Sequence, residues 1–122
     1  MNMNEIATAV RQKLPLIEVI VNNHVLGMVR QWQDLFYEKR YSATVLDDGV
    51  DYVKLAEAMG ATGYRATTRE TFNEALKAAL AAKTPVVIDC VIGCDDKVWP
   101  MVAPGADIST AFTGEDLAAA QS

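Results

Sequence analysis

Residues 14–29 read LPLIEVIVNNHVLGMV, and this stretch decides the fold. Pro15 opens an apolar, β-branched run that ends abruptly at Asn22 and Asn23. The pattern predicts a buried parallel strand whose carboxyl end delivers polar groups to a site. The amide oxygens of the two asparagines are hard ligands of the kind that suits Mg²⁺. Gly27 then allows the backbone to approach a ligand closely where a helix begins.

An asparagine in this position also has a purely structural use. Its side chain can close a turn by hydrogen bonding to the nearby backbone, and an isolated Asn-Asn pair favours that interpretation. Two interpretations of Asn22 and Asn23 therefore remain open: they close a turn, or they ligate a metal ion.

The composition indicates one domain and excludes several classes of protein. The chain has 122 residues, 51% of them hydrophobic, and a formal net charge of −5, which is enough for one domain with its own core. An acidic chain without a basic stripe argues against binding to nucleic acid or to an anionic membrane. The longest apolar runs are too short to span a bilayer, and the N-terminus lacks the order of a signal peptide. We therefore expect a cytoplasmic protein.

The two cysteines, Cys90 and Cys94, are expected to be ordinary reduced thiols. A zinc site would need further ligands, and His24 is the only histidine.

Alternating periodicities predict an α/β domain. Helices are expected in residues 4–14, 27–40, 51–59, 68–82 and 114–120, and strands in residues 17–22, 63–67 and 85–92. Thr71 and Glu74 fit a capping box at the start of the fourth helix. This order predicts an open parallel sheet with helices on both faces. Because three strands are few for such a sheet, we expect the fold to be N-terminally truncated, with a further strand upstream or on other polypeptide.

Several motifs resemble one enzyme family. Residues 14–23 resemble the second half of the thiamine diphosphate motif, which begins with Gly-Asp-Gly and ends in Asn-Asn. Further similarity lies in residues 27–37 (GMVRQWQDLFY), 51–60 (DYVKLAEAMG) and 98–105 (VWPMVAPG). Together they resemble the C-terminal domain of the large, catalytic subunit of acetolactate synthase, also called acetohydroxyacid synthase. The resemblance covers nearly the whole chain.

The resemblance implies how the chain would hold thiamine diphosphate and Mg²⁺. Asn23 would ligate the metal through its side chain, and Val25 would offer its main-chain carbonyl to the same ion. Backbone amides around Leu26, Gly27 and Met28 would hold the diphosphate, as expected for an anion at the start of a helix.

The helix expected after Gly27 carries an apolar stripe with two interpretations. By resemblance, Met28 would lie near the thiazolium, and Trp32 would line the pocket for the second 2-oxoacid substrate. A stripe at helical spacing is also typical of a core, which is the expectation for Leu35 and Phe36. We expect Arg30 to be an ordinary surface charge.

The resemblance also implies parts of the family that this sequence does not contain. The Gly-Asp-Gly segment, with the aspartate ligand of the metal, would lie just before Met1. The N-terminal domain with its activating glutamate and the middle domain that holds FAD would lie further upstream, so no catalytic residue is assigned in this chain. We expect residues 1–105 to be the C-terminal part of the thiamine-diphosphate domain. Residues 106–122 would form a tail, and residues 99–105 would act as a lid.

The implied function is part of an acetolactate synthase of branched-chain amino-acid biosynthesis. The whole enzyme would decarboxylate pyruvate and condense the hydroxyethyl unit with a second 2-oxoacid. It would act as a homodimer or higher oligomer, with a regulatory subunit as an open alternative. Two other functions remain as alternatives: another thiamine-dependent carboligase, of the glyoxylate carboligase or acetyltransferase type, and a non-catalytic α/β interaction module.

The first prediction concerns the isolated chain. The purified 122-residue chain, supplied with thiamine diphosphate, Mg²⁺ and pyruvate, is expected to form no acetolactate, because the metal would lack its charged protein ligand. A colorimetric acetolactate assay makes the measurement, and product above the level of a heat-denatured control would contradict the expectation.

Overall fold

The computed structural model describes residues 3–46 and 49–120. Contacts group these residues into two compact units. The sheet unit comprises the described residues of Met1–His24 and Leu46–Gly93, and the helix unit those of Val25–Val45 and Cys94–Ser122. The division expected at residue 105 stays a prediction, and residues 121–122 of the expected tail lie outside the described residues.

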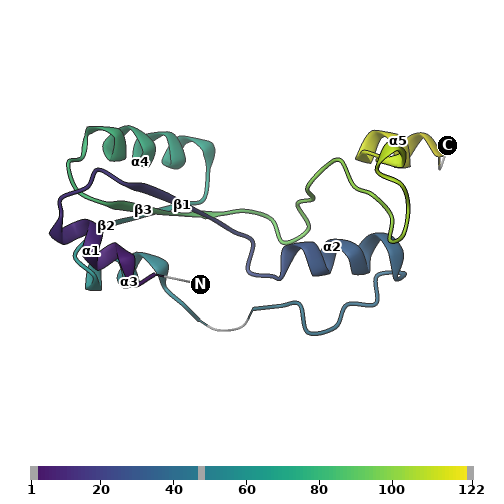
Figure 1. Ribbon diagram of the computed structural model, residues 1–122, viewed down its shortest axis with the longest axis horizontal. Coiled ribbons are helices and arrows are strands. Elements are labelled where there is room, and N and C mark those ends of the chain that lie inside the picture. Colours follow the sequence, from purple (N-terminus) through teal and green to yellow (C-terminus); the bar gives the residue numbers. More distant parts are fainter. Residues whose placement is uncertain (1–2, 47–48, 121–122) are drawn as a thin grey trace. The chain divides into compact units, whose positions relative to one another are not determined.

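The sheet unit contains a three-stranded parallel sheet, as predicted (Figure 1). Its strands are β1 (Ile17–Asn22), β2 (Thr62–Ala66) and β3 (Val86–Val91), in the spatial order β1-β3-β2. The parallel register places Ile17 of β1 and Thr62 of β2 opposite the same residue of β3, Val86. The carboxyl ends of all three strands therefore lie at one end of the sheet.

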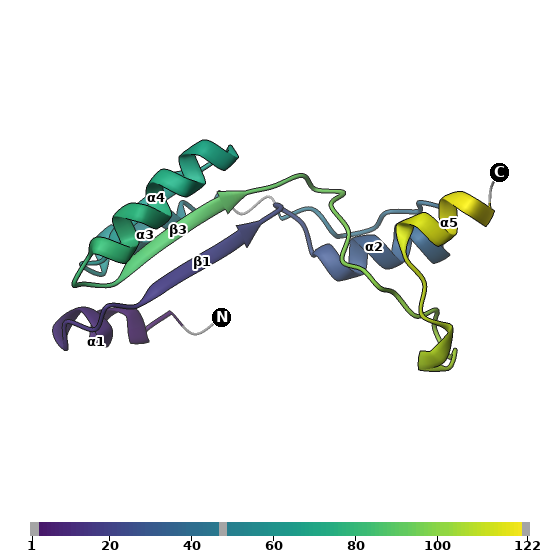
Figure 2. The same cartoon turned by 90° about the horizontal axis from the view of Figure 1, so that it is seen from above.

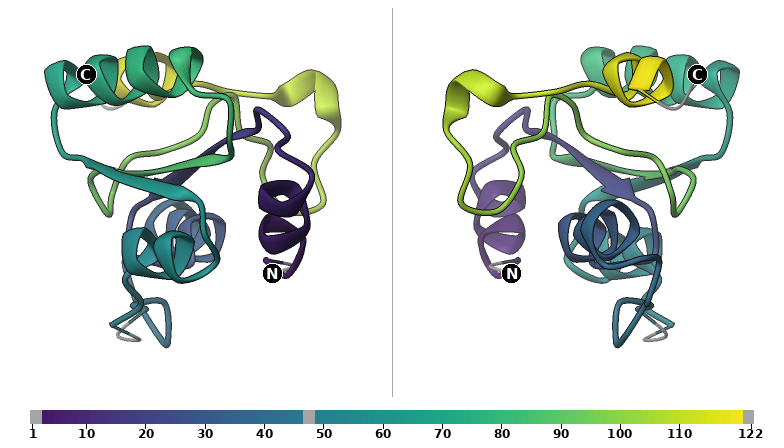
Figure 3. Two further views of the ribbon diagram at one scale, coloured as in Figure 1. Left: turned by 90° about the vertical axis from the view of Figure 1, so that its left-hand side faces the viewer. Right: turned by 90° about the vertical axis from the view of Figure 1, so that its right-hand side faces the viewer.

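Helices cover both faces of this sheet, which confirms the predicted layering (Figure 3). On one face, α4 (Arg69–Ala81) packs with residues such as Ala75 on Ile88 and its neighbours. On the other face, α1 (Glu5–Arg11) and α3 (Tyr52–Ala58) pack around Val87. Alternate residues of β3 thus enter opposite cores, and its first four residues are all buried.

The position of β1 corrects one prediction. Its six residues were expected to form a buried strand, but none of them is buried, and Val21 is 66% exposed. Among the described residues β1 pairs only with β3 (Figure 2), so its other edge has no neighbouring strand to cover it.

The ends of the helices show which local signals decide them. Asp51 caps α3 by accepting a hydrogen bond from the Lys54 amide, and Gly60 follows with φ +87°, a left-handed conformation that suits glycine. The predicted Thr71–Glu74 capping box is wrong. Thr68 caps α4 instead, and its exchange of hydrogen bonds with Thr71 starts the helix at Arg69.

The helix unit is built on α2 (Gly27–Phe36), with a short 3₁₀ turn, Ile108–Thr110, and α5 (Gly114–Ala120). The prediction extended α2 to residue 40, but Glu38 and Lys39 have positive φ angles of 53° and 58°, which a helix cannot contain. Residues 99–105 contain no helix or strand, as expected, apart from a bridge between Met101 and Phe112. None of the described helices has the length and apolar character that crossing a membrane requires.

Candidate functional site

The first functional feature is the turn at the end of β1. The Asn22 side-chain oxygen accepts a hydrogen bond from the His24 amide at 3.1 Å, which closes a turn across Asn23. His24 adopts a left-handed backbone with φ +56°, the conformation that such a turn asks of the residue after it. The structural interpretation is therefore confirmed for Asn22. Asn23 occupies the middle of the turn.

The other end of the Asn22 amide contacts a buried carboxylate. Its nitrogen donates a hydrogen bond of 2.9 Å to one oxygen of Asp89, which is only 2% exposed. The second Asp89 oxygen accepts from Arg65 Nε at 3.1 Å. Asp89 lies in β3 directly opposite Arg65 of β2, so each neighbouring strand supplies one partner to the buried carboxylate.

Arg65 extends this contact to a helix. Its terminal nitrogen donates to Asp51 at 2.8 Å, while the same Asp51 oxygen caps α3. The hydrogen bond from the Lys54 backbone and the charge of Arg65 lower the pKa of Asp51. Beside this chain of polar contacts lies a cavity of about 350 Å³, which is lined by His24, Gly49, Val50, Asp51, Arg65, Asp89 and Val91.

In the helix unit, the start of α2 has the character of an anion site. Gly27 is the first helical residue, and Leu26 at the N-cap offers no side-chain acceptor. The Leu26 amide itself bonds to the Thr44 carbonyl at 2.8 Å. The amides of the first turn and the helix dipole together favour a bound anion such as a diphosphate. The Leu26 amide is thus already engaged, while the Gly27 and Met28 amides lie in the first turn of α2. The assignment of Leu26, Gly27 and Met28 to the cofactor stays a prediction.

The residues predicted to bind the metal lie in different units. Asn23 belongs to the sheet unit, whereas Val25 belongs to the helix unit, where it is buried and bridges to Val45 in antiparallel fashion. Within residues 3–46 and 49–120 no cluster of three histidine, cysteine or acidic side chains could hold a metal ion. The assignment of Asn23 and Val25 as ligands stays a prediction.

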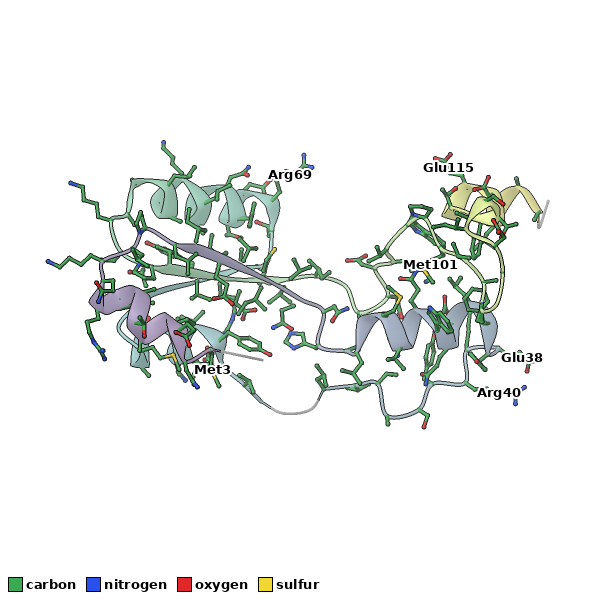
Figure 4. The ribbon with its side chains drawn as sticks, viewed as in Figure 1. Met3, Glu38, Arg40, Arg69, Met101 and Glu115 are labelled. Atoms are coloured by element: carbon green, nitrogen blue, oxygen red, sulfur yellow. The ribbon has the colours of Figure 1, made fainter. Side chains whose placement is uncertain are left out.

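The two residues predicted for the substrate pocket line one cavity. Met28 and Trp32 face an apolar cavity of about 500 Å³, which is also lined by Val29, Gln33, Phe36, Tyr37, Glu38 and Arg40. Glu38 and Arg40, paired with each other, lie just beyond the C-terminal end of α2 (Figure 4). A hollow of this size and character is suited to a small apolar group with a polar end.

The aromatic stripe on α2 is partly a core, as its alternative interpretation predicts. The Trp32 and Phe36 rings meet edge to face at 5.8 Å, and Phe36 contacts Phe112 at 6.2 Å. Phe112 in turn contacts Trp99 at 6.0 Å. The segment that was predicted to act as a lid therefore packs onto the aromatic side of α2 through Phe112.

Two glutamines of α2 each hold a neighbouring backbone segment from both sides. Gln31 donates to the Val98 carbonyl at 2.8 Å and accepts from the Val98 amide at 2.9 Å. Gln33 makes the same pair of hydrogen bonds with Ser42, at 3.2 and 3.0 Å. Gln31 is only 4% exposed, while Gln33 is partly exposed. The Gln31 pair thus closes a buried contact between α2 and the segment that leads to Trp99.

Charged side chains reinforce this contact and correct the expectation for Arg30. Arg30 pairs with Asp95 at 2.7 Å and lies over the Tyr41 ring at 4.0 Å, so it is not an ordinary surface charge. Asp34 accepts hydrogen bonds from Lys97 at 2.8 Å and from the Tyr41 hydroxyl at 2.7 Å. These bonds lower the pKa of Asp34, and the same carboxylate raises the pKa of Tyr41.

Sequence reasoning missed two of these residues. Asp89 was counted within an apolar strand, although an acidic residue in a run of buried β-branched residues signals a paired charge. Gln31 lies between residues of an apolar stripe and carries no local sign of its two hydrogen bonds to Val98.

Comparison with known proteins gives a consistent family. Residues 1–90 match the model of the thiamine pyrophosphate enzyme C-terminal TPP binding domain. An acetolactate synthase of Mycobacterium avium is 46% identical over 110 residues, which cover 86% of this chain and 18% of that protein. An acetolactate synthase large subunit of Parasynechococcus marenigrum is 44% identical, with 86% and 17% covered. The isozyme 2 large subunit of Escherichia coli is 42% identical, with 89% and 20% covered.

A solved structure supports the same fold. The chain is similar to the thiamine diphosphate-dependent 4-hydroxybenzoylformate decarboxylase of Rhodococcus jostii, with a TM-score of 0.66 and 30% identity, over 75% of this chain and 17% of that one. The chain spans about a fifth or less of the curated relatives named above.

The paired glutamines allow a matched test. Gln31→Glu is expected to lower the free energy of unfolding by about 1–3 kcal/mol, because a buried donor to the Val98 carbonyl is replaced by an oxygen. Gln33→Glu makes the same chemical change at a partly exposed position and is expected to cost less than about 1 kcal/mol. Urea unfolding measures both variants, and faster amide exchange at Val98 in Gln31→Glu alone locates the effect. An equal loss in the free energy of unfolding in the two variants would contradict the expected role of the buried Gln31 pair.

Proposed function

The chain belongs to the family of thiamine pyrophosphate enzymes, through their C-terminal TPP binding domain, and we propose on this premise that it forms part of an acetolactate synthase large subunit. The sequence identity of 42–46% to proteins of that name, over 86–89% of the chain, carries the proposal. The similarity to the 4-hydroxybenzoylformate decarboxylase is lower, at 30%, so the carboligase is favoured over a decarboxylase of the same family.

The chain's part in this function is to bind the cofactor. Asn23 and Val25 would supply oxygens to Mg²⁺, and the backbone amides of Gly27 and Met28 would hold the diphosphate beside Leu26, whose own amide donates to Thr44. The uncapped start of α2 supports the second assignment, because it leaves the first-turn amides and the helix dipole facing an anion. When bound, thiamine diphosphate would supply the carbanion chemistry that joins two 2-oxoacids.

The residues of α2 would shape the substrate side of the site. Met28 and Trp32 share the apolar cavity with Phe36, where an alkyl group of a second 2-oxoacid would displace water. Their role is to orient this substrate and to keep water away. Packing of Trp32 against Phe36 would hold the indole in place, which orientation of a substrate requires.

The wider partners belong to the same proposal. The substrates would be pyruvate and a second small 2-oxoacid, and the enzyme would work in the cytoplasm as a homodimer or a higher oligomer. A regulatory subunit would be a further partner.

Metal binding gives a direct test of the Asn23 assignment. With thiamine diphosphate present, Mn²⁺ is expected to broaden the NMR signals of the Asn23 side-chain amide and of the Gly27 and Met28 backbone amides in the 122-residue chain. Asn23→Ala is expected to weaken Mn²⁺ binding by roughly tenfold, about 1.4 kcal/mol. Asn73→Ala, on the exposed surface of α4, is the matched control. Undisturbed signals in the wild-type chain, or equal affinity in the Asn23 variant, would overturn the assignment.

A region exchange tests the reaction. We expect a chimera in which this chain replaces the matching region of the Escherichia coli isozyme 2 large subunit to form acetolactate from pyruvate. In that chimera Trp32→Ala is expected to reduce the preference between two 2-oxoacids as second substrate by about tenfold, the usual scale for an apolar pocket contact. Leu80→Ala, at a leucine that is 71% exposed, should leave the preference unchanged. A folded, cofactor-loaded chimera without acetolactate formation would contradict the proposed reaction.

A further inference from the structure

Three strands place polar side chains together at one end of the sheet. In the parallel register, Asp89 of β3 stands opposite Ile20 of β1 and Arg65 of β2. Asn22 lies two residues beyond Ile20 and therefore points to the same face. Because Val87 and Ile20 of that face pack with α1 and α3, the polar group lies where this helix-covered face reaches the carboxyl end of the sheet.

The chemistry of Asp89 determines which way round the Asn22 amide lies. Asp89 forms an ion pair with Arg65 at 3.1 Å, and an ionised carboxylate only accepts hydrogen bonds. The Asn22 group that faces Asp89 must therefore be the NH₂ group. Its oxygen then faces the opposite direction, where it accepts from the His24 amide at 3.1 Å.

We propose that Asp89 is a positioning residue for the cofactor metal: it orients the Asn22 amide and thereby holds the turn that carries Asn23. The proposal rests on the proposed function, because it takes Asn23 as the metal ligand. Asp89 does not touch the metal in this account. It acts through two hydrogen bonds: Asp89 accepts one from the Asn22 NH₂ group at 2.9 Å, and the Asn22 oxygen accepts one from the His24 amide at 3.1 Å.

Because Arg65 fixes one side of Asp89, replacing a single Asp89 oxygen by nitrogen is enough to reverse the orientation of the Asn22 amide. In Asp89→Asn, the new side chain must keep its oxygen towards Arg65 Nε, which can only donate. It then presents its NH₂ group to Asn22, so the Asn22 amide has to turn over to accept. The NH₂ group of Asn22 would face the His24 amide, and two donors would meet where the wild-type turn has a hydrogen bond.

A second substitution should restore the turn. In the double variant Asp89→Asn with Asn22→Asp, the new amide still accepts from Arg65 and donates to the new carboxylate. The second oxygen of that carboxylate can again accept from the His24 amide. Asn22→Asp alone instead places two carboxylates against each other, at the 2.9 Å contact of Asn22 with Asp89. The double variant therefore rescues both single variants only if the orientation of the amide matters.

The test follows the His24 hydrogen bond by NMR in the full 122-residue chain. The wild-type chain is expected to show a scalar coupling across the hydrogen bond between the His24 amide nitrogen and the Asn22 side-chain carbon. Asp89→Asn should abolish this coupling and speed His24 amide exchange at least tenfold, and the double variant should restore both. Glu18→Gln, which removes the same charge from an exposed position of β1, should change neither.

Each outcome is decisive. A His24 coupling that is absent in the wild type, or that persists in Asp89→Asn, overturns the proposal. If Asp89→Asn does not fold, the wild-type coupling and the double variant decide, and a double variant that also fails to fold contradicts the proposal. Mn²⁺ affinity with thiamine diphosphate is then measured on the same proteins, and it should fall at least tenfold in Asp89→Asn and return in the double variant. Failure of the proposed function alone would give a different result. The His24 coupling would still be lost in Asp89→Asn and restored in the double variant, but Mn²⁺ would not broaden the Asn23 signals of the wild-type chain.

Discussion

The buried carboxylate of Asp89 sets the condition on which the polar end of the sheet depends. A charge that is only 2% exposed has lost its water, and it persists only when it is paired and hydrogen bonded. The structure meets this requirement with one partner from each neighbouring strand, Arg65 from β2 and Asn22 from β1. The central strand thus holds both neighbours at the end of the sheet where ligands bind in parallel α/β folds.

Sequence patterns predicted the order of elements because that order follows from strong periodicities. The strand 17–22 was placed residue for residue. Helix ends were less certain, because the competing signals are local. Thr68 and Thr71 can both cap a helix, and only the backbone at Thr68 is extended in the way a cap requires. The exposure of β1 depends on which strands lie beside it, and a single strand's composition does not contain that information.

Some residues of the candidate site could also be predicted from the sequence, and others could not. Gly27 and the asparagines stand out because they interrupt an apolar run, and the structure gives the first asparagine the turn role. Asp89 and Gln31 act through partners 67 residues away in the sequence, so neither a motif nor a period marks them. The pairing of strands and the packing of residues 94–98 on α2 had to be known first.

Side-chain amides do similar work in both units, and this explains why carboxylates would not replace them. Asn22, Gln31 and Gln33 each use the nitrogen to donate and the oxygen to accept. Gln31 and Gln33 face a carbonyl and an amide of one residue, so either orientation error costs two hydrogen bonds. Asn22 faces two different partners, and its orientation depends on the charge of Asp89. A primary amide can join a backbone donor to a carboxylate without adding charge, which suits the residue beside a metal ligand.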